Sequence, residues 1–199
     1  MGWAPDYGDS DEAKAWVRVD DSLDDDEIGL IVTSVSRGID DHCNRQFGVV
    51  DVAEQRFYTA RWDYERGRWV VDIDDLMTTT NAAFAVTGVG AVTAYTLEPR
   101  NAVAKGKPWT RLVVDVDSGV MPTGEEFEMD LTALWGWTAV PSPVRVAWRL
   151  QTNRILSRRD SPYGVAGSPQ DGSELRLLSR LDPDVAVSLR GLVRSRAVA

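Results

Sequence analysis

The sequence has very few of the residues that most enzymes and metalloproteins use. One cysteine, Cys43, and one histidine, His42, stand side by side in a chain of 199 residues. A single cysteine excludes an internal disulfide framework. A zinc site would lack its remaining cysteine or histidine ligands, and a catalytic triad would have His42 as its only base. We therefore expect His42 and Cys43 to form a core or interface pair.

Long apolar runs and a secretion signal are also missing. No uninterrupted apolar segment approaches the ~20 residues that a membrane-spanning helix needs. The first residues, MGWAPDYGDSDEA, contain neither a basic region nor an apolar run, so they do not read as a signal peptide. We expect a soluble protein with no membrane contact, made in a reducing compartment.

Carboxylate clusters are the remaining route to catalysis or metal binding. Asp72, Asp74 and Asp75 close a predicted strand, and residues 24–27 open a predicted helix. Paired carboxylates can bind Mg²⁺ or Ca²⁺ or share a proton, but neither run matches an EF-hand loop, and helix capping accounts for the second. We predict no catalytic residue, no metal and no cofactor. A metal-assisted hydrolase at Asp72–Asp75 is a weak alternative.

Charge is distributed unevenly along the chain, whose net charge is −9. Residues 1–54 hold fourteen acids and four bases, whereas residues 141–199 hold ten arginines and five acids. Opposite charge at the two ends favours contact between subunits, or docking on a partner of defined sign. Surface helices that merely differ in charge are the simpler alternative. The acidic remainder argues against a sequence-reading DNA-binding protein.

Helical patterns lie at both ends of the chain. The first covers about residues 10–18, and the second starts with Asp24 as N-cap and Glu27 as its partner. A third starts at Pro141 to Pro143. Residues 161–172 read as a loop, and further helical segments are predicted over 174–181 and from 182 through Val193. The apolar stripes of the second and third helices consist of Ile28, Ile31, Val32, Val35 and Ile39, and of Val144, Ala147, Trp148, Gln151 and Ile155.

Between Val49 and Val140 the apolar period changes to two, which predicts strands. The candidates number about six, and the first two flank a glycine-containing hairpin turn at 63–67. The predicted class is α+β: a helical bundle from the N- and C-terminal helices with an inserted small antiparallel β domain. We expect an N-terminal helical pair over 1–50, the β domain over 51–140 and C-terminal helices over 141–199. The strand candidates cover residues 55–62, 68–76, 82–88, 92–99, 109–116 and 126–137.

Eight tryptophans are many for this length, and five fall in the predicted β domain. An exposed row of them would suit a binding module for carbohydrate or nucleic acid, because indole rings stack on sugars and bases. Such residues more often fill a sheet core or anchor a subunit interface. Both readings stay open here. The five are Trp62, Trp69, Trp109, Trp135 and Trp137.

Four segments resemble a known family. They are DDDEIGLIVTSVSRGIDDHCNRQFG (24–48), YTLEPRNAVAKGKPWTRLVV (95–114), LWGWTAVPSPVRVA (134–147) and RILSRRDSPYGVAGSPQDGSELRLLSRLDPDV (154–185). In this order they are similar to the head-to-tail connector (adaptor) proteins of long-tailed double-stranded DNA phages, particularly those that infect actinobacteria. The fourth segment is the most specific, and the tryptophan-rich β region departs most from the pattern.

The resemblance implies a structural virion protein rather than an enzyme. Such adaptors form a dodecameric ring beneath the portal protein, extend the DNA channel and carry a stopper or tail-terminator protein. The expected location is therefore the head–tail junction of the virion, after assembly in the host cytoplasm. A neighbouring stopper or tail-terminator role is an alternative within the same machinery. The resemblance makes Arg154, Arg158, Arg159, Tyr163, Leu175, Leu178, Leu181 and Leu189 candidates for portal or ring contacts.

The charge distribution suggests a second contact, between subunits. The acidic residues 1–54 of one subunit can face the basic C-terminal region of its neighbour in a heterologous, ring-closing contact. The acidic candidates for this contact open the second predicted helix, and they are Asp24, Asp25, Asp26 and Glu27.

Overall fold

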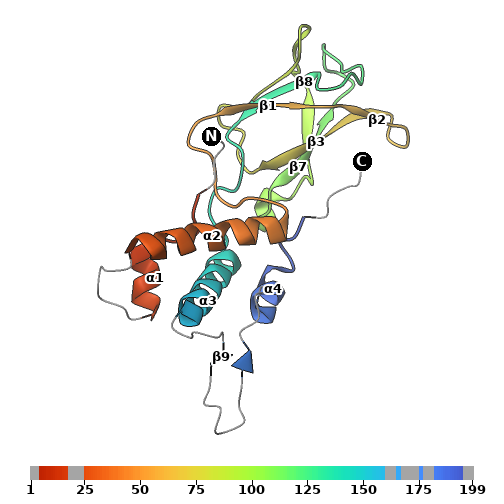
Figure 1. Cartoon of the computed structure of the whole chain (residues 1–199). Coiled ribbons are helices and arrows are strands. Elements are labelled where there is room, and N and C mark those ends of the chain that lie inside the picture. Colours follow the sequence, from red (N-terminus) through yellow and green to blue (C-terminus); the bar gives the residue numbers. More distant parts are fainter. Residues whose placement is uncertain (1–4, 18–24, 160–164, 167–174, 177–181, 195–199) are drawn as a thin grey trace. The chain divides into compact units, whose positions relative to one another are not determined.

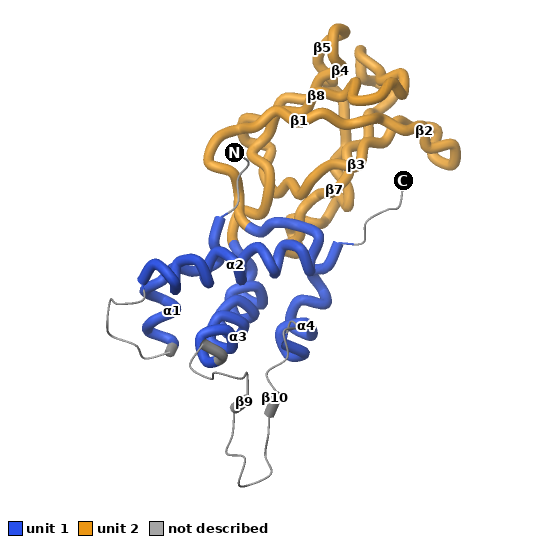
Figure 2. Tube along the Cα trace, in the orientation of Figure 1, with its two compact units in different colours: residues 1–47, 140–199 blue, residues 48–139 orange. Residues whose placement is uncertain are grey.

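The computed structural model describes residues 5–17, 25–159, 165–166, 175–176 and 182–194 (Figure 1). The chain divides into two compact units (Figure 2). We call residues 1–47 with 140–199 the helical unit and residues 48–139 the β unit. The described ranges contain four α-helices and two four-stranded antiparallel sheets, so the predicted α+β class is confirmed. In these ranges no helix combines the length and the apolar character that crossing a membrane requires.

The helical unit contains α1 (Ser10–Val17), α2 (Asp25–Cys43), α3 (Ser142–Arg159) and α4 (Pro183–Leu189). Helix α1 begins where the sequence predicted it, because the Asp9 carboxylate accepts the backbone N–H of Glu12 at 2.7 Å and caps the first turn. Asp24, the predicted N-cap of α2, lies outside the described residues, whereas its predicted partner Glu27 lies in the first turn of the helix. Three acids in the first turn of α2 complement the positive end of the helix.

Helix α2 turns its predicted apolar stripe into the core. Ile28, Val32, Val35 and Ile39 are buried, whereas Ile31 is half-buried. The helix ends at Cys43 because Asn44 adopts a left-handed conformation with φ 51°, which asparagine tolerates better than most residues.

Helix α3 packs against α2 and buries Trp148 completely. The indole Nε1 of Trp148 donates a hydrogen bond to the carbonyl oxygen of Val32 at 3.3 Å. Gly8 lies against the same ring, and a Cβ there would come within 2.3 Å of it. The buried stripe of α3 continues through Thr152 and Leu156, while the predicted Gln151 and Ile155 lie at its edge and are half-buried.

The prediction of a helix over residues 174–181 is wrong at the two positions that the structure describes. Leu175–Arg176 forms the short strand β10, which pairs antiparallel with β9 (Val165–Ala166). The helix predicted from residue 182 exists as α4, capped by Asp182, whose carboxylate accepts the backbone N–H of Asp184 at 2.9 Å. It ends at Leu189, so the predicted Val193 lies beyond it and is exposed.

The β unit contains eight strands in two sheets, whereas the sequence predicted a compact antiparallel sheet or small barrel of about six strands. One has the order β1-β8-β4-β5 and the other the order β2-β3-β7-β6. Phe84 of β4 and Tyr95 of β6 join the two sheets through an edge-on ring contact with centroids 4.8 Å apart. The strands are β1 (Glu54–Tyr58), β2 (Arg61–Asp63), β3 (Arg68–Leu76), β4 (Ala83–Val86), β5 (Gly90–Ala91), β6 (Tyr95–Glu98), β7 (Trp109–Val114) and β8 (Met129–Ala133).

One of the two additional strands, β5, lies between the predicted strands 82–88 and 92–99. The other arises because the segment predicted as one strand over 55–62 is broken at Thr59 and Ala60. Strand β1 pairs with β8 in one sheet, whereas β2 pairs with β3 in the other. The predicted hairpin between β2 and β3 is confirmed: Asp63 accepts two backbone N–H groups of the turn, and Gly67 supplies a φ of 61°.

Strand periodicity separates an apolar face from a charged face on the sheet β2-β3-β7-β6. Val71, Ile73 and Leu112 point into the core and are almost completely buried. The opposite face carries Asp72 and Arg111, which are cross-strand neighbours. Val70 and Val113 lie on this same face and are buried, so the charged face is solvated in part.

Candidate functional site

Arg145, Arg149 and Arg154 of α3 bind acids of the same chain, and of these only Arg154 was a predicted partner contact. Arg145 and Arg149 both bind the carboxylate of Glu12 on α1, with the Arg145 Nη2 at 3.0 Å and the Arg149 Nε at 2.8 Å. The Arg149 guanidinium also lies over the ring of Trp16, 5.5 Å from its centroid. These contacts tie α1 to α3.

Arg154 is also engaged within its own subunit. It donates to the carboxylate of Asp182 and makes an ion pair with it. Asp182 in turn caps α4, and its backbone N–H donates to Gln151 on α3 at 3.2 Å. Arg154 therefore fixes the start of α4 against α3, and only 16% of its side chain is exposed.

Of the other predicted contact residues, one is a buried leucine, and the side chains of the rest are not described by the structure. Leu189 is fully buried in the helical unit, so it belongs to the core of its own subunit rather than to a contact surface. The remaining side chains lie outside the described part of the structure, although three of these residues have a described backbone in α3 or β10. They are Arg158, Arg159, Tyr163, Leu175, Leu178 and Leu181.

The acidic candidates on α2 are at the surface. Asp25 forms an ion pair with Lys14 of α1, so its charge is used within the subunit. Asp26 and Glu27 are exposed, and Asp24 lies outside the described residues.

A buried polar cluster joins the segment before α1 to α2. The Tyr7 phenol donates to Asp40 and accepts the backbone N–H of Phe47 at 2.9 Å, while the Tyr7 N–H donates to Ser36 at 3.1 Å. Burial raises the pKa of Asp40 to about 6, although the Tyr7 hydrogen bond and the charge of Arg37 oppose this shift. Burial, with the hydrogen bond to Asp40, also raises the pKa of Tyr7. Sequence reasoning did not find this cluster.

The predicted pair His42–Cys43 is divided between surface and core. Cys43 is fully buried, and burial raises the pKa of its thiol to about 11, so it stays protonated and unreactive. His42 is exposed. The two side chains therefore do not form one site.

The run Asp72, Asp74 and Asp75 does not converge on one point. Asp72 pairs with Arg61 and Arg111. Asp74 accepts from Arg56 at 2.7 Å, and the buried Asp75 accepts the indole N–H of Trp137 at 2.8 Å. Across the described residues, no three His, Cys, Asp or Glu side chains gather closely enough to hold a metal ion.

The tryptophans of the β unit do not form an exposed row. Trp135 and Trp137 are buried, and Trp69 and Trp109 are half-buried. Trp62 is 40% exposed and packs edge-on against Trp69, its cross-strand neighbour, with ring centroids 5.3 Å apart. The indoles of this unit therefore serve mainly its core.

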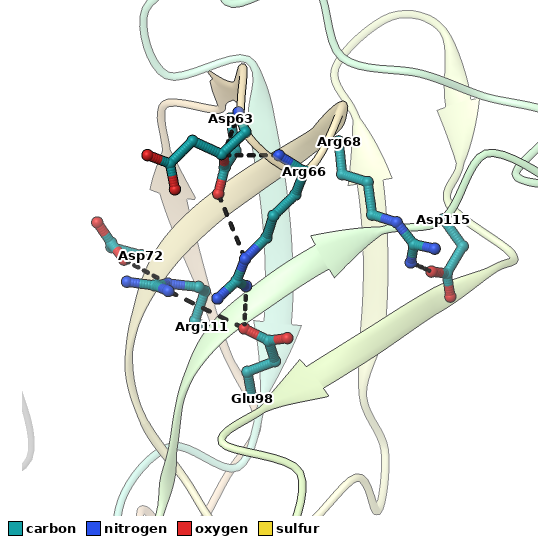
Figure 3. Close-up of polar contacts among 8 residues, drawn as sticks. Asp63, Arg66, Arg68, Asp72, Glu98, Arg111 and Asp115 are labelled. Carbon is teal, nitrogen blue, oxygen red and sulfur yellow. Dashed lines mark hydrogen bonds and ion pairs between the residues drawn. The ribbon is translucent and has the colours of Figure 1, made fainter.

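The solvated face of the sheet β2-β3-β7-β6 carries a lattice of ion pairs (Figure 3). Arg66 reaches from the β2–β3 turn to Glu98 on β6 at 2.9 Å, and Arg68 binds Asp115 at 2.7 Å. Four arginines and four carboxylates alternate here, so the lattice is neutral as a whole. The lattice consists of Arg61, Asp63, Arg66, Arg68, Asp72, Glu98, Arg111 and Asp115.

Within the lattice lies a hollow of about 230 Å³. Its lining residues are two arginines, an aspartate, a tryptophan and a valine. The arginines that line it already bind Asp72, so a ligand would have to compete with that carboxylate. The lining residues are Arg61, Trp62, Asp63, Val70 and Arg111.

No protein-family model matches the chain, and no curated protein sequence is significantly similar to it.

Proposed function

We propose that this protein is a head-to-tail adaptor of a long-tailed double-stranded DNA phage. It would form a ring beneath the portal protein, extend the DNA channel and provide the platform for a stopper or tail-terminator protein. The observation that carries the proposal is the ordered resemblance of four sequence segments, above all residues 154–185. The role places the protein at the head–tail junction of the virion.

Two structural findings support a structural role over an enzymatic one. The described histidine, cysteine and carboxylate side chains are spread over separate environments, and each buried one is held by other protein groups or shielded in the core. In addition, Arg145, Arg149 and Arg154 of α3 and the lattice arginines form ion pairs within the chain, and these ion pairs connect elements of the fold.

The direct test is electron microscopy of purified portal protein mixed with this chain. We expect additional ring density on one side of the portal and, at the proposed stoichiometry, twelve copies for each portal. A protein that stays monomeric on its own is compatible with this role, because assembly on the portal is the relevant state. Absence of added density at every salt concentration would refute the adaptor role.

A second candidate function has one specific observation in its favour. A hollow of about 230 Å³ is lined by Arg61, Asp63 and Arg111, with Trp62 and Val70, and its charged groups suit a hydroxyl-rich ligand such as a glycan. Titration with glycans and with oligonucleotides, followed by tryptophan fluorescence, tests this binding module. If neither series changes the fluorescence and the protein binds the portal, the binding module is refuted and the adaptor role remains.

A further inference from the structure

The β unit leaves only three of its basic side chains without an acidic partner, and all three lie on one loop. Its other five bases are arginines in ion pairs with carboxylates: Arg56, Arg61, Arg66, Arg68 and Arg111. Arg100, Lys105 and Lys107 lie between β6 and β7, are exposed and form no ion pair. Residues 48–139 are described throughout, so this statement covers the whole unit. We call residues 99–107 the cationic loop.

The cationic loop is held in one conformation. It contains a short 3₁₀ helix over Val103–Lys105, which Gly106 ends with a φ of 65°. Ala102 is buried, and its carbonyl oxygen accepts the backbone N–H groups of Lys105 and Lys107, each at 2.9 Å. Three cations on a rigid loop lose little entropy when they bind an anionic surface.

A loop of opposite charge leaves the other end of β7. Residues 117–127, the acidic loop, carry Asp117, Glu125 and Glu126, which are exposed and form no ion pair in this fully described unit. The loop is fixed by the buried carboxylate of Glu128, which accepts the backbone N–H groups of Thr123 at 2.8 Å and Gly124 at 2.7 Å. The unpaired charges of the two loops are +3 and −3.

The acidic loop also presents an aromatic side chain in a strained backbone conformation. Phe127 has a φ of 57° and is 59% exposed. A left-handed conformation costs a bulky residue about 1–2 kcal/mol, and a ring that is more than half exposed gains little packing within its own subunit to offset this. The Phe127 N–H donates to Thr59 Oγ1 at 3.0 Å, which holds the residue in place. Exposed, pre-positioned aromatic residues are typical anchors of protein interfaces.

We propose that the cationic loop of one copy docks on the acidic loop of the next copy, with Phe127 as the apolar contact. The loops lie at opposite ends of β7, about 20 Å apart along a six-residue strand, so the same contact repeats head to tail and closes a ring where the rotation allows it. The docking surface is thus a second copy of this chain. Duplex DNA suits the cationic loop less well, because the whole chain carries a charge of −9. This inference rests on the proposed ring.

A charge-swap experiment tests the contact. One variant reverses the cationic loop (Arg100→Glu, Lys105→Glu, Lys107→Glu), and the other reverses the acidic loop (Asp117→Lys, Glu125→Lys, Glu126→Lys). Each variant alone brings like charges together at every contact, so we expect ring density on the portal to be lost. An equal mixture restores opposite charges if the two variants alternate, which an even-numbered ring permits, so we expect rings to return.

The outcomes separate the two proposals. If the wild type adds no ring to the portal, the adaptor role fails, and the loop contact fails with it. If the wild type assembles and either reversed variant assembles equally well, only the loop contact is refuted. The loop contact is also refuted if the mixture fails to assemble although circular dichroism shows that both variants are folded. A third outcome refutes it too: the wild type binds duplex DNA and the cationic-loop variant does not.

Three further variants distinguish a docking role from a purely structural one. Asp51→Lys with Glu65→Lys changes the charge as much as Glu125→Lys with Glu126→Lys, also at exposed positions without ion pairs, but outside both loops. We expect the first pair to assemble like the wild type and the second pair to assemble at least tenfold less. Phe127→Gly should keep or raise the stability of the β unit, because glycine adopts the positive φ freely, and should weaken assembly. Unchanged assembly of Phe127→Gly would remove this residue from the contact.

Discussion

Tyr7 and Asp40 lie 33 positions apart and share a buried hydrogen bond that the Tyr7 phenol donates. The same phenol oxygen accepts the backbone N–H of Phe47 at 2.9 Å. One side chain therefore connects three parts of the helical unit: the segment before α1, the body of α2 and the residues that follow it. The stability of this unit should depend on the cluster, and two predictions concern it.

Tyr7→Phe removes the phenol but keeps the ring, which packs against Phe47. Asp40 then loses a donor and the N–H of Phe47 loses its acceptor, so we expect the free energy of unfolding to fall by about 2 kcal/mol. Chemical denaturation followed by circular dichroism measures this loss. Tyr64→Phe is the control, because Tyr64 is exposed and should change the free energy by less than about 0.5 kcal/mol.

Asp40 gives the helical unit a specific pH dependence. Its pKa rises from 3.8 to about 6 in the folded protein, so the folded state binds this proton more tightly than the unfolded chain. Its contribution to stability is therefore complete below about pH 4 and is lost as the pH rises through about 6. Asp40→Asn lacks this titration, so between pH 4 and pH 7 its stability should rise relative to the wild type by roughly 1–3 kcal/mol. If Asp41→Asn, at an exposed neighbour, showed the same rise in stability between pH 4 and pH 7, the pH dependence would not come from Asp40.

The β unit also has a buried hydrogen bond to an aspartate, between Trp137 and Asp75. Trp137→Phe removes the indole N–H that Asp75 accepts at 2.8 Å, and it leaves a smaller ring in the core. We expect a loss of about 2–4 kcal/mol in the free energy of unfolding. Trp62→Phe, at a part-exposed ring, should cost less than about 1 kcal/mol. Equal losses in the two variants would show that the Asp75 contact contributes little.

Glu128 should control the order of the acidic loop. Glu128→Gln keeps the size of the side chain, but the backbone N–H groups of Thr123 and Gly124 bind different carboxylate oxygens. Glutamine keeps only one acceptor oxygen, so one of these N–H groups then faces the side-chain NH2 group, and the other meets a neutral acceptor. We expect limited proteolysis to cut within residues 117–127 several times faster than in the wild type. Glu126→Gln changes an exposed neighbour and should leave the rate unchanged; a similar acceleration there would refute the special role of Glu128.

Arg158→Glu with Arg159→Glu tests the portal contact that the family resemblance implies. We expect the double variant to fold normally and to lose portal docking in a co-sedimentation assay. Arg145→Glu with Arg149→Glu is the contrasting variant, because those two arginines bind Glu12 within the subunit and should mainly affect stability. Docking of the Arg158 and Arg159 variant at wild-type affinity would remove both residues from the interface.

Local sequence patterns predicted most elements of the fold. The α+β class, the starts of α1, α3 and α4 and the β2–β3 hairpin follow from caps, prolines and apolar periodicity, which act over a few residues. The two sheets did not follow, because a change of sheet at Thr59 and Ala60 depends on partners far away in the sequence. The predicted helix over 174–181 conflicts with β10, where pairing with β9 outweighs local propensity.

The predicted site residues show a different limit of sequence reasoning. An excess of arginine at one end and of acid at the other does not tell whether the charges meet within one subunit or between two. Arg154 meets Asp182, and Arg145 meets Glu12, both within the chain. Sequence reasoning did not single out the loop with Arg100, Lys105 and Lys107, because its character depends on which other bases of the β unit form ion pairs. The positive φ of Phe127 has no signal in the sequence.

The helical unit is built from both ends of the chain, and this has a consequence for synthesis on the ribosome. Trp148 closes on Val32, 116 positions earlier, so α1 and α2 must wait for α3 to leave the exit tunnel. The β unit contains all of its own strands in residues 48–139 and is complete before α3 is translated. Nascent chains stalled where residue 139 has left the exit tunnel but α3 has not should therefore carry a folded β unit attached to helices without a core, and the helical unit should form last.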